Sequence, residues 1–268
     1  MTRRRFYAPP AAFAPDGAGV TLSEDETRHL RDVLRLRAGD EAFVFDGEGR
    51  EFACFVTDAG GHKTNEAGGR GKSLATLEVR RAVEPPSRES PLALALAAAL
   101  LKGEKFDLVV QKATELGVAR IVPVAAKRAD VRPRDERDSA RRLERWRRLA
   151  LEAAKQSGRA RVPTVSAPAE FENFVSVETE VGVARLMFAE RGGEPLGVEG
   201  AKAFDKDARA VSNIVALVGP EGGWDEDEIA LAREKGWRII TLGGRVLRAE
   251  TAGLVVCALL QNMFGDLK

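Results

Sequence analysis

The sequence is poor in the side chains on which most nucleophilic and metal-dependent chemistry relies. Its 268 residues include two cysteines, two histidines and one tyrosine. Cys54 and Cys257 lie far apart and form no CxxC or Cys/His cluster, which argues against a disulfide framework or a zinc site and predicts two buried, reduced thiols. His29 and His62 join no recognisable Ser/His/Asp or Cys/His grouping, so nucleophilic catalysis is disfavoured.

Long hydrophobic runs and common nucleotide or protease motifs are also missing. The apolar run Leu92–Leu101 is too short to cross a membrane, and no apolar signal-peptide segment follows the basic residues Arg3–Arg5. No GxxxxGK[ST], HExxH or GxGxxG motif is present. We therefore expect a cytoplasmic protein without a resident metal.

The net charge of +1 conceals an uneven distribution of charge along the chain. Residues 127–161 contain 13 Lys+Arg and 6 Asp+Glu, a balance of +7, whereas residues 170–235 contain 15 acidic and 7 basic residues, a balance of −8. This asymmetry is typical of a protein that binds a polyanion on one face, and equally of a solvated arginine-rich helix. Composition alone weighs the two interpretations evenly.

Residues 1–83 are predicted to form a small, mostly β domain. A helix should begin at Ser23, which has the capping-box spacing to Glu26. Strands are expected over 41–45, 51–57 and 74–83, and the glycine-rich stretch 58–73 is expected to be a long, mobile loop. The prolines of segment 84–91 predict a linker, because proline interrupts both helix and sheet.

Residues 92–268 alternate between strand and helix patterns, which predicts an α/β domain with a mostly parallel sheet. The expected strands are 92–100, 119–124, 183–188, 214–218 and 237–242; the expected helices are 104–116, 137–157, 225–235 and 250–264. The last helix is apolar on nearly all sides and should be buried all round. A subunit contact and ordinary core burial explain that pattern equally well.

Two glycine-marked loops, Val218–Trp224 and Leu242–Arg248, each join a strand to a helix. Such paired loops are where open α/β sheets bind their ligands, although an ordinary tight turn has the same sequence signature. The first loop runs into the four carboxylates of 225–228, which favours a neutral or cationic ligand over a polyphosphate.

The second loop places Arg245 and Arg248 beside Glu250. One interpretation is an arginine directed at a substrate phosphate or at charge developing on a base. The other is a structural ion pair between Arg248 and Glu250.

Several segments together resemble the RsmE family, the bacterial 16S ribosomal RNA uridine-N3 methyltransferases of the SPOUT superfamily. The matching segments occur in the family's order over nearly the whole chain: Arg4-Arg5-Phe6, His29–Leu36 with Gly39-Asp40, Phe45-Asp46-Gly47, Lys102-Gly103, Lys112–Val118, Glu152-Ala153-Ala154, Gln156–Arg159, Val218–Gly223, Leu242-Gly243, Arg245–Arg248 and Glu250-Thr251-Ala252.

The resemblance implies a PUA-like β-barrel for RNA over 1–83 and a SPOUT methyltransferase domain with a trefoil knot over 92–268. It implies S-adenosylmethionine as the cofactor, 16S ribosomal RNA of the small ribosomal subunit as the partner, and a homodimer formed through the knot and the last helix. The implied cofactor-binding residues are Leu217, Gly219, Pro220, Glu221, Gly222, Gly223, Leu242, Gly243, Val246, Leu247, Arg248 and Ala252.

For the chemistry, uridine N3 must lose its proton before it can attack a methyl group. We expect Arg248 to stabilise the developing anion and Glu250 to hold Arg248; no general base is identified. The expected RNA-binding residues are Arg3, Arg4, Arg5, Arg28, Arg31, Arg35, Arg128 and Arg159.

Two positions depart from the family pattern: Gly244 stands where proline is usual, and Lys155 where an acidic residue is common. They leave open a non-catalytic RNA-binding or ribosome-assembly protein of the same fold. A SPOUT methyltransferase for another RNA position is the second alternative.

Overall fold

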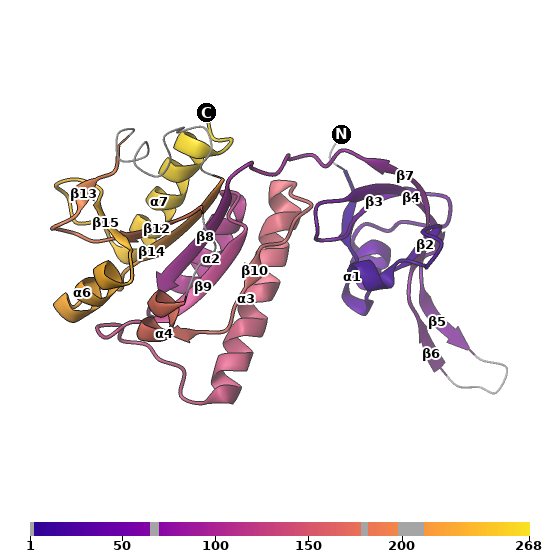
Figure 1. Cartoon of the computed structure of the whole chain (residues 1–268). Coiled ribbons are helices and arrows are strands. Elements are labelled where there is room, and N and C mark those ends of the chain that lie inside the picture. The colour runs from indigo at the N-terminus through magenta and orange to yellow at the C-terminus, as the bar shows by residue number, and fades with distance from the viewer. Residues whose placement is uncertain (1–2, 65–69, 178–181, 198–211) are drawn as a thin grey trace. The chain divides into compact units, whose positions relative to one another are not determined.

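The computed structural model describes residues 3–64, 70–177, 182–197 and 212–268 (Figure 1). The chain forms two compact units, one of Met1–Glu89 with Ala154–Val162 and the other of Ser90–Ala153 with Pro163–Lys268. The domain limits 1–83, 84–91 and 92–268 stay a prediction. The compact units differ from them in that a short segment after residue 153 is grouped with the N-terminal residues.

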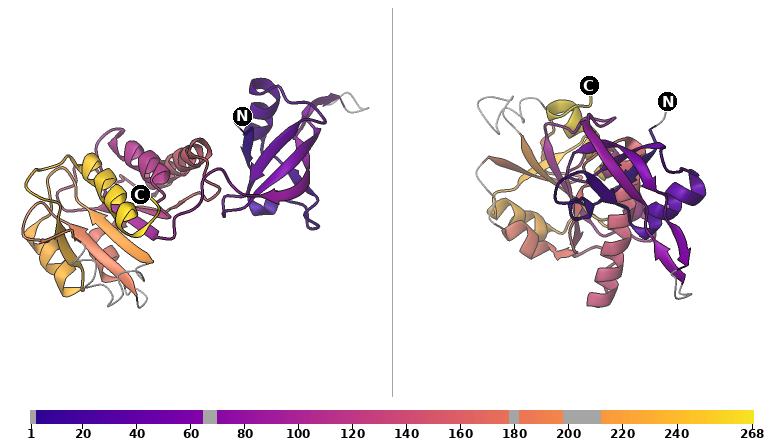
Figure 2. Two further views of the ribbon diagram at one scale, coloured as in Figure 1. Left: turned by 90° about the horizontal axis from the view of Figure 1, so that it is seen from above. Right: turned by 90° about the vertical axis from the view of Figure 1, so that its right-hand side faces the viewer.

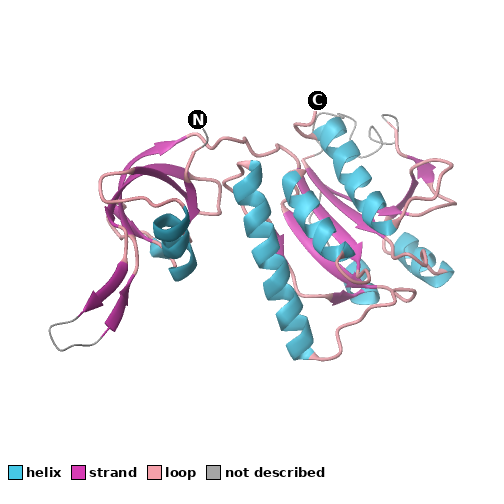
Figure 3. Cartoon of the chain, turned by 180° about the vertical axis from the view of Figure 1, so that it is seen from behind, coloured by secondary structure: helices cyan, strands magenta, loops and turns pink. Residues whose placement is uncertain are grey.

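The first unit contains a curved five-stranded sheet in the order β1-β3-β4-β7-β2 (Figure 3). The strands are β1 Arg5–Tyr7, β2 Gly19–Thr21, β3 Glu41–Phe45, β4 Glu51–Asp58 and β7 Thr76–Val83. A 3-10 turn, η1, covers Pro10–Ala12. Phe6, Leu22, Leu30, Val44 and Leu77 are buried together and form the core of this unit.

The predicted helix of the first unit begins as expected. The Ser23 hydroxyl accepts a hydrogen bond of 3.3 Å from the Glu26 backbone N–H at the start of α1, Glu24–Arg28. The helix then widens into a π-helical turn, η2, over His29–Val33.

The glycine-rich stretch 58–73, expected to be one long loop, contains a β-hairpin. Strands β5 Gly61–Thr64 and β6 Arg70–Ser73 pair antiparallel; residues 65–69 lie outside the described part of the chain. The prediction was wrong for these two strands because β4 and β7 are already paired at Asp58 and Thr76. The chain leaving β4 therefore runs beside the chain entering β7, and backbone pairing extends the ribbon whatever the side chains are.

The second unit is built on an eight-stranded sheet in the order β10-β9-β8-β14-β12-β15-β13, with β11 also paired to β9. Every pairing in this sheet is parallel, which confirms the predicted mostly parallel α/β fold. The strands are β8 Ala93–Ala99, β9 Arg120–Ala125, β10 Thr164–Val165, β11 Ala169–Glu170, β12 Val183–Phe188, β13 Glu194–Pro195, β14 Asn213–Val218 and β15 Arg238–Thr241. A trefoil knot in this region stays an expectation.

Helices cover both faces of this sheet (Figures 1 and 2). They are α2 Lys105–Glu115, α3 Glu136–Ser157, α4 Phe171–Ser176, α6 Glu226–Glu234 and α7 Ala249–Phe264. Side chains of α4 and α6, with Trp224 and Trp237, pack on one face against Met187 and Leu217. Helices α2 and α7 contact each other, and α7 also contacts β8 and β14.

The apolar composition of helix α7 predicts burial on all sides. Within the single chain this prediction is wrong. Val256, Cys257 and Leu260 are fully buried, but Leu259 remains 38% exposed. Leu108 on α2 is 40% exposed. Both cysteines are free and buried, as predicted, and burial raises the pKa of Cys54 and of Cys257 to about 12.

Candidate functional site

A cavity of about 470 Å³ lies at the carboxyl ends of β14, β12 and β15, which are neighbours in the sheet. Three strand-to-helix or strand-to-strand loops line it: the residues after β12, the Val218–Trp224 loop after β14, and the Leu242–Leu247 part of the loop after β15. Side chains from the starts of α6 and α7, and Arg128, complete the lining. Carboxyl ends of parallel strands are the usual place for a ligand in open α/β sheets.

The cavity brings together most of the residues expected to bind a cofactor. Gly219, Pro220, Gly222, Gly223, Leu242, Gly243, Val246, Leu247 and Ala252 line it. Leu217, Glu221 and Arg248 do not. Leu217 is instead fully buried on β14.

The first glycine loop is fitted too closely for larger residues. Gly223 has a φ of +67°, which favours glycine. A Cβ on Gly219 would lie 3.0 Å from the Trp224 ring, and one on Gly222 would lie 3.1 Å from the Arg128 carbonyl oxygen. The indole Nε1 of Trp224 donates a hydrogen bond of 2.8 Å to the Phe188 carbonyl, which joins this loop to the end of β12.

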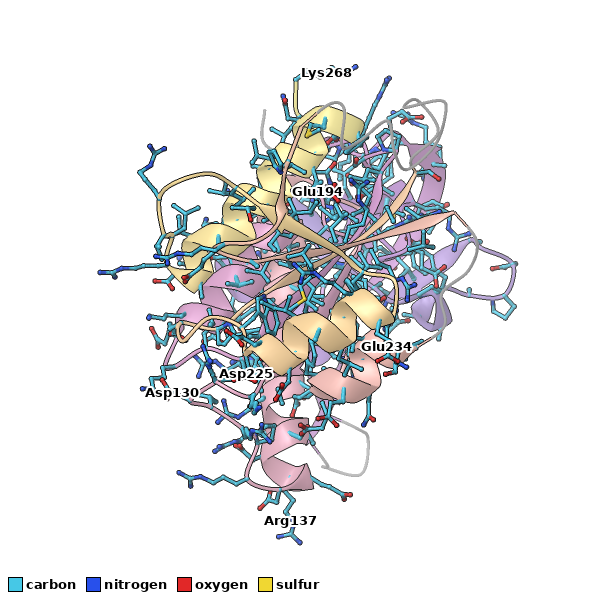
Figure 4. The ribbon with its side chains drawn as sticks, turned by 60° about the vertical axis from the view of Figure 1, so that its left-hand side comes forward. Asp130, Arg137, Glu194, Asp225, Glu234 and Lys268 are labelled. Atoms are coloured by element: carbon cyan, nitrogen blue, oxygen red, sulfur yellow. The ribbon has the colours of Figure 1, made fainter. Side chains whose placement is uncertain are left out.

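The carboxylates at the start of α6 are paired with basic side chains that lie about 100 residues earlier in the sequence. Asp225 lies at the start of α6 (Figure 4). It caps the helix and forms a capping box with Glu228. Lys127 Nζ lies 2.8 Å from Asp225 Oδ1 and 3.0 Å from Asp227 Oδ2, and Arg128 Nη2 lies 3.1 Å from Asp225 Oδ2.

These contacts shift the titration of both partners. The hydrogen bond from Lys127 is the main cause that lowers the pKa of Asp225, and the same carboxylate raises the pKa of Lys127. Of the four carboxylates, only that of Glu226 belongs to a residue lining the cavity. The charge of the lining is therefore mixed: Glu190 and Glu226 are acidic, and Arg128, Arg191 and Arg245 are basic.

The second loop supplies apolar walls and a glycine with positive φ. Leu242, Val246 and Leu247 line the cavity, and Gly243 has a φ of +118°. Arg248 is the N-cap residue of α7 and is exposed. Within the described part of the chain no ion pair joins Arg248 to Glu250; Glu250 instead lies 3.9 Å from Lys105 Nζ.

Sequence reasoning missed the contribution of the loop after β12. Phe188, Ala189, Glu190 and Arg191 all line the cavity. The signal was available, because these residues directly follow a predicted buried strand, as both glycine loops do. Gly192 and Gly193 follow them, so this loop carries a glycine mark as well. Arg128, expected at an RNA surface, also lines the cavity.

Two of the arginines expected to bind RNA are buried inside the first unit. Arg5 is 8% exposed, lies 2.8 Å from the buried Glu51, and donates hydrogen bonds of 3.0 Å and 2.9 Å to the carbonyls of Lys155 and Arg159. Arg159 is 4% exposed and pairs with Glu89 at 2.7 Å. Their contacts stabilise the unit, and their burial leaves almost no surface for RNA.

The other expected RNA residues of this unit are more accessible. Arg4 and Arg35 are exposed. Arg3 pairs with Glu51 at 3.1 Å, Arg28 with Glu24 at 3.4 Å, and Arg31 with Asp32 at 2.7 Å. These pairs leave their side chains between 33% and 59% exposed.

Lys155, one of the two departures from the family pattern, forms an ion pair with Glu26. Its Nζ lies 2.7 Å from Glu26 Oε1, and both side chains are largely buried. Gly244, the other departure, is exposed, and a Cβ placed there would meet no atom within 4 Å.

Across the described ranges, no cluster of three or more His, Cys, Asp or Glu residues is arranged to hold a metal ion. In the same ranges no helix combines the length and apolar character needed to span a membrane.

The fold agrees with what comparison with known proteins finds. Residues 88–261 match the model of an RNA methyltransferase domain, and residues 22–64 match that of an RNA methyltransferase PUA domain. The class is therefore that of the RNA methyltransferases that combine a PUA domain with a parallel α/β domain.

Individual relatives identify the family within this class. Ribosomal RNA small subunit methyltransferase E of Synechocystis is 35% identical over 90% of this chain and 72% of its own length. The crystal structure of ribosomal RNA small subunit methyltransferase E from Neisseria gonorrhoeae, bound to S-adenosylmethionine, matches with a TM-score of 0.80 and 31% identity over 100% of both chains. A Legionella pneumophila structure with the same cofactor matches with a TM-score of 0.81 and 28% identity over 100% of both chains. The chain belongs to the ribosomal RNA small subunit methyltransferase E (RsmE) family.

Proposed function

We propose that this protein uses S-adenosylmethionine to methylate N3 of a uridine in the 16S ribosomal RNA of the small ribosomal subunit, in the cytoplasm. The observation that carries the proposal is the glycine-lined cavity at the ends of β12, β14 and β15. Membership of the family, and the cofactor held by the Neisseria gonorrhoeae relative, support it.

The residues around the cavity fit this cofactor. Its volume of about 470 Å³ is within the range of small-molecule sites. Gly219 and Gly222 place backbone without side chains along the lining, and Leu242, Val246 and Leu247 offer apolar surface. Glu190 and Glu226 suit cationic groups, and the three lining arginines suit a carboxylate, so the lining matches a ligand that carries both charges. When bound, S-adenosylmethionine supplies an electrophilic methyl group on a sulfonium.

The protein's own part in the reaction is to stabilise the uridine as N3 loses its proton. We assign this to Arg248, the exposed N-cap residue of α7. Arg245, in the same loop, lines the cavity and is the second candidate. Glu250, which was expected to hold Arg248, is paired with Lys105 instead.

The first unit is proposed to bind the RNA backbone. Its match to an RNA methyltransferase PUA domain supports this role, and so do the accessible side chains of Arg4, Arg28, Arg31 and Arg35. Because each released counter-ion contributes to binding, affinity for RNA should fall steeply with salt.

The active form is proposed to be a homodimer. Leu108 of α2 and Leu259 of α7 are 40% and 38% exposed on two helices that contact each other. A second copy of the chain would remove this apolar surface from water. Sedimentation of the purified protein at a single-chain mass would contradict the assignment.

Calorimetric titration with S-adenosylmethionine, with ATP as the control, tests the cofactor part of the proposal. We expect saturable binding of S-adenosylmethionine alone. Absence of binding by a folded protein would instead favour a non-catalytic RNA-binding protein of the same fold. A methyltransferase for another RNA position would bind the cofactor but leave the uridine of 16S ribosomal RNA unmodified.

A further inference from the structure

The turn between β8 and α2 contacts both sides of the candidate site from outside the cavity. Lys105, the first residue of α2, lies between two carboxylates: its Nζ is 3.0 Å from Glu221 Oε1 and 3.9 Å from Glu250 Oε2. Glu221 belongs to the first glycine loop, and Glu250 lies in the first turn of α7, directly after the second loop. A single ammonium group thus contacts the flanks of both loops.

The two carboxylates share that cation. The Glu250 side chain is 13% exposed, and its Oε2 is buried without a hydrogen-bond donor among the residues the structure describes. Glu221 is 26% exposed. Two carboxylates that share one neighbourhood repel each other, and a buried carboxylate without a counter-ion is strongly destabilising.

The cluster is adjacent to the cavity lining at both ends. Glu221 stands between Pro220 and Gly222, and Glu250 directly follows Ala249; all three of these neighbours line the cavity. Each carboxylate is therefore one residue away in sequence from backbone that lines the cavity.

We propose that Lys105 is a positioning residue that fixes the two glycine loops in the arrangement that binds S-adenosylmethionine. The inference rests on the proposed cofactor. It assigns to Lys105 the pre-organisation of the site, since loops that are already ordered lose less conformational freedom when a ligand binds.

The chain offers a matched control for this role. Lys102 lies three residues before Lys105 and pairs with Asp130 at 2.7 Å, but the side chains of Lys102 and Asp130 are both more than half exposed. The hydrogen bond from Lys102 to Asp130 is the main cause that raises the pKa of Lys102, and Glu221 contributes as well. Lys102→Met therefore removes a lysine from the same electrostatic surroundings without removing the cation between Glu221 and Glu250.

The test measures cofactor affinity by calorimetry in Lys105→Met, Lys105→Arg, Lys102→Met and the double variant Lys105→Met/Glu221→Gln. We expect Lys105→Met to weaken binding by about tenfold or more, because a charged contact between two loops is lost. Lys105→Arg should recover most of that affinity, and the double variant part of it, because one of the two repelling carboxylates is gone. Lys102→Met should stay within about twofold of the unmodified protein.

Amide hydrogen exchange of the unliganded proteins provides a second readout that needs no cofactor. Lys105→Met should speed exchange over 219–224 and 249–252, whereas Lys102→Met should not. Equal affinity of Lys105→Met and the unmodified protein would overturn the inference, as would equal losses in all three single variants. If the unmodified protein fails to bind S-adenosylmethionine, the proposed function fails, and unchanged exchange in Lys105→Met would then separately reject the role of Lys105.

Discussion

The indole N–H of Trp224 donates a hydrogen bond of 2.8 Å to the carbonyl of Phe188 and so connects the loop after β14 to the end of β12. Both residues line the cavity. The Trp224 ring also packs against Phe171 of α4, with ring centroids 5.2 Å apart. One side chain therefore sets the distance between two of the three loops that form the site.

Replacing Trp224 with phenylalanine should weaken cofactor binding. The substitution keeps an aromatic ring but removes the donor, and a buried hydrogen bond of this kind contributes about 1 kcal/mol, or roughly fivefold in affinity. Calorimetric titration with S-adenosylmethionine measures it. Trp237→Phe is the matched control, since Trp237 Nε1 donates to Val175 at 3.1 Å and does not line the cavity. Equal losses in both variants would contradict this account.

At Asp225, two substitutions separate helix capping from charge pairing. Asparagine caps a helix about as well as aspartate, so Asp225→Asn should leave helix α6 intact while removing the ion pairs to Lys127 and Arg128. Asp225→Ala should lose about 1 kcal/mol more of unfolding free energy, because the cap is lost as well. Chemical denaturation distinguishes them; equal stability of the two variants would show that the cap contributes nothing.

The arginines of the second loop should affect different steps. Arg248→Ala should reduce methyl transfer by about a hundredfold with little change in cofactor affinity, because the lost interaction arises only as charge develops on the base. Arg245→Ala should weaken cofactor binding, since Arg245 lines the cavity. Single-turnover rates at saturating cofactor, beside calorimetric affinities, measure both. Near-normal transfer by Arg248→Ala with normal RNA binding would end the assignment.

Salt dependence should distinguish surface arginines from structural ones in the first unit. The exposed residues Arg4 and Arg35 are expected to contact phosphates, so the double variant Arg4→Ala/Arg35→Ala should lower the slope of log affinity against log salt by roughly two. Arg5→Ala should instead lower the stability of the unit, because Arg5 is buried against Glu51. A slope unchanged in the double variant would show that these two arginines are not phosphate contacts.

Lys155 and Glu26 should stabilise the first unit through their interaction with each other. Replacing Lys155 with methionine removes this ion-pair partner from the largely buried Glu26 carboxylate. We expect the free energy of unfolding to fall by about 3 kcal/mol. Lys155→Met/Glu26→Gln should recover a large part of it. A loss in the double variant as large as in the single one would show that the two charges do not stabilise the fold through each other.

Much of this architecture follows from patterns that are local in the sequence. The apolar run at residues 92–100 predicted β8, and the capping-box spacing at Ser23 predicted the start of α1, because each depends on neighbouring residues alone. The two glycine loops were also predicted, since glycine marks close backbone approach. They proved to meet at one cavity because β14 and β15 both lie beside β12.

The remaining features depend on residues distant in sequence. The counter-ions of Asp225 come from Lys127, about 100 residues earlier, and Arg5 finds its acceptors at Lys155 and Arg159. Composition therefore overestimated both the acidity facing the ligand and the number of arginines free for RNA. The contact of Lys105 with Glu221 and Glu250 likewise requires the folded sheet to bring three loops together.

The most direct test of the central claim is mapping of the methyl group after 16S ribosomal RNA and small ribosomal subunits are incubated with the protein and labelled S-adenosylmethionine. We predict label in a single 3-methyluridine, dependent on the cofactor and lost in Arg248→Ala. Label in a different nucleoside, or no label from a folded protein that binds the cofactor, would contradict the proposed function.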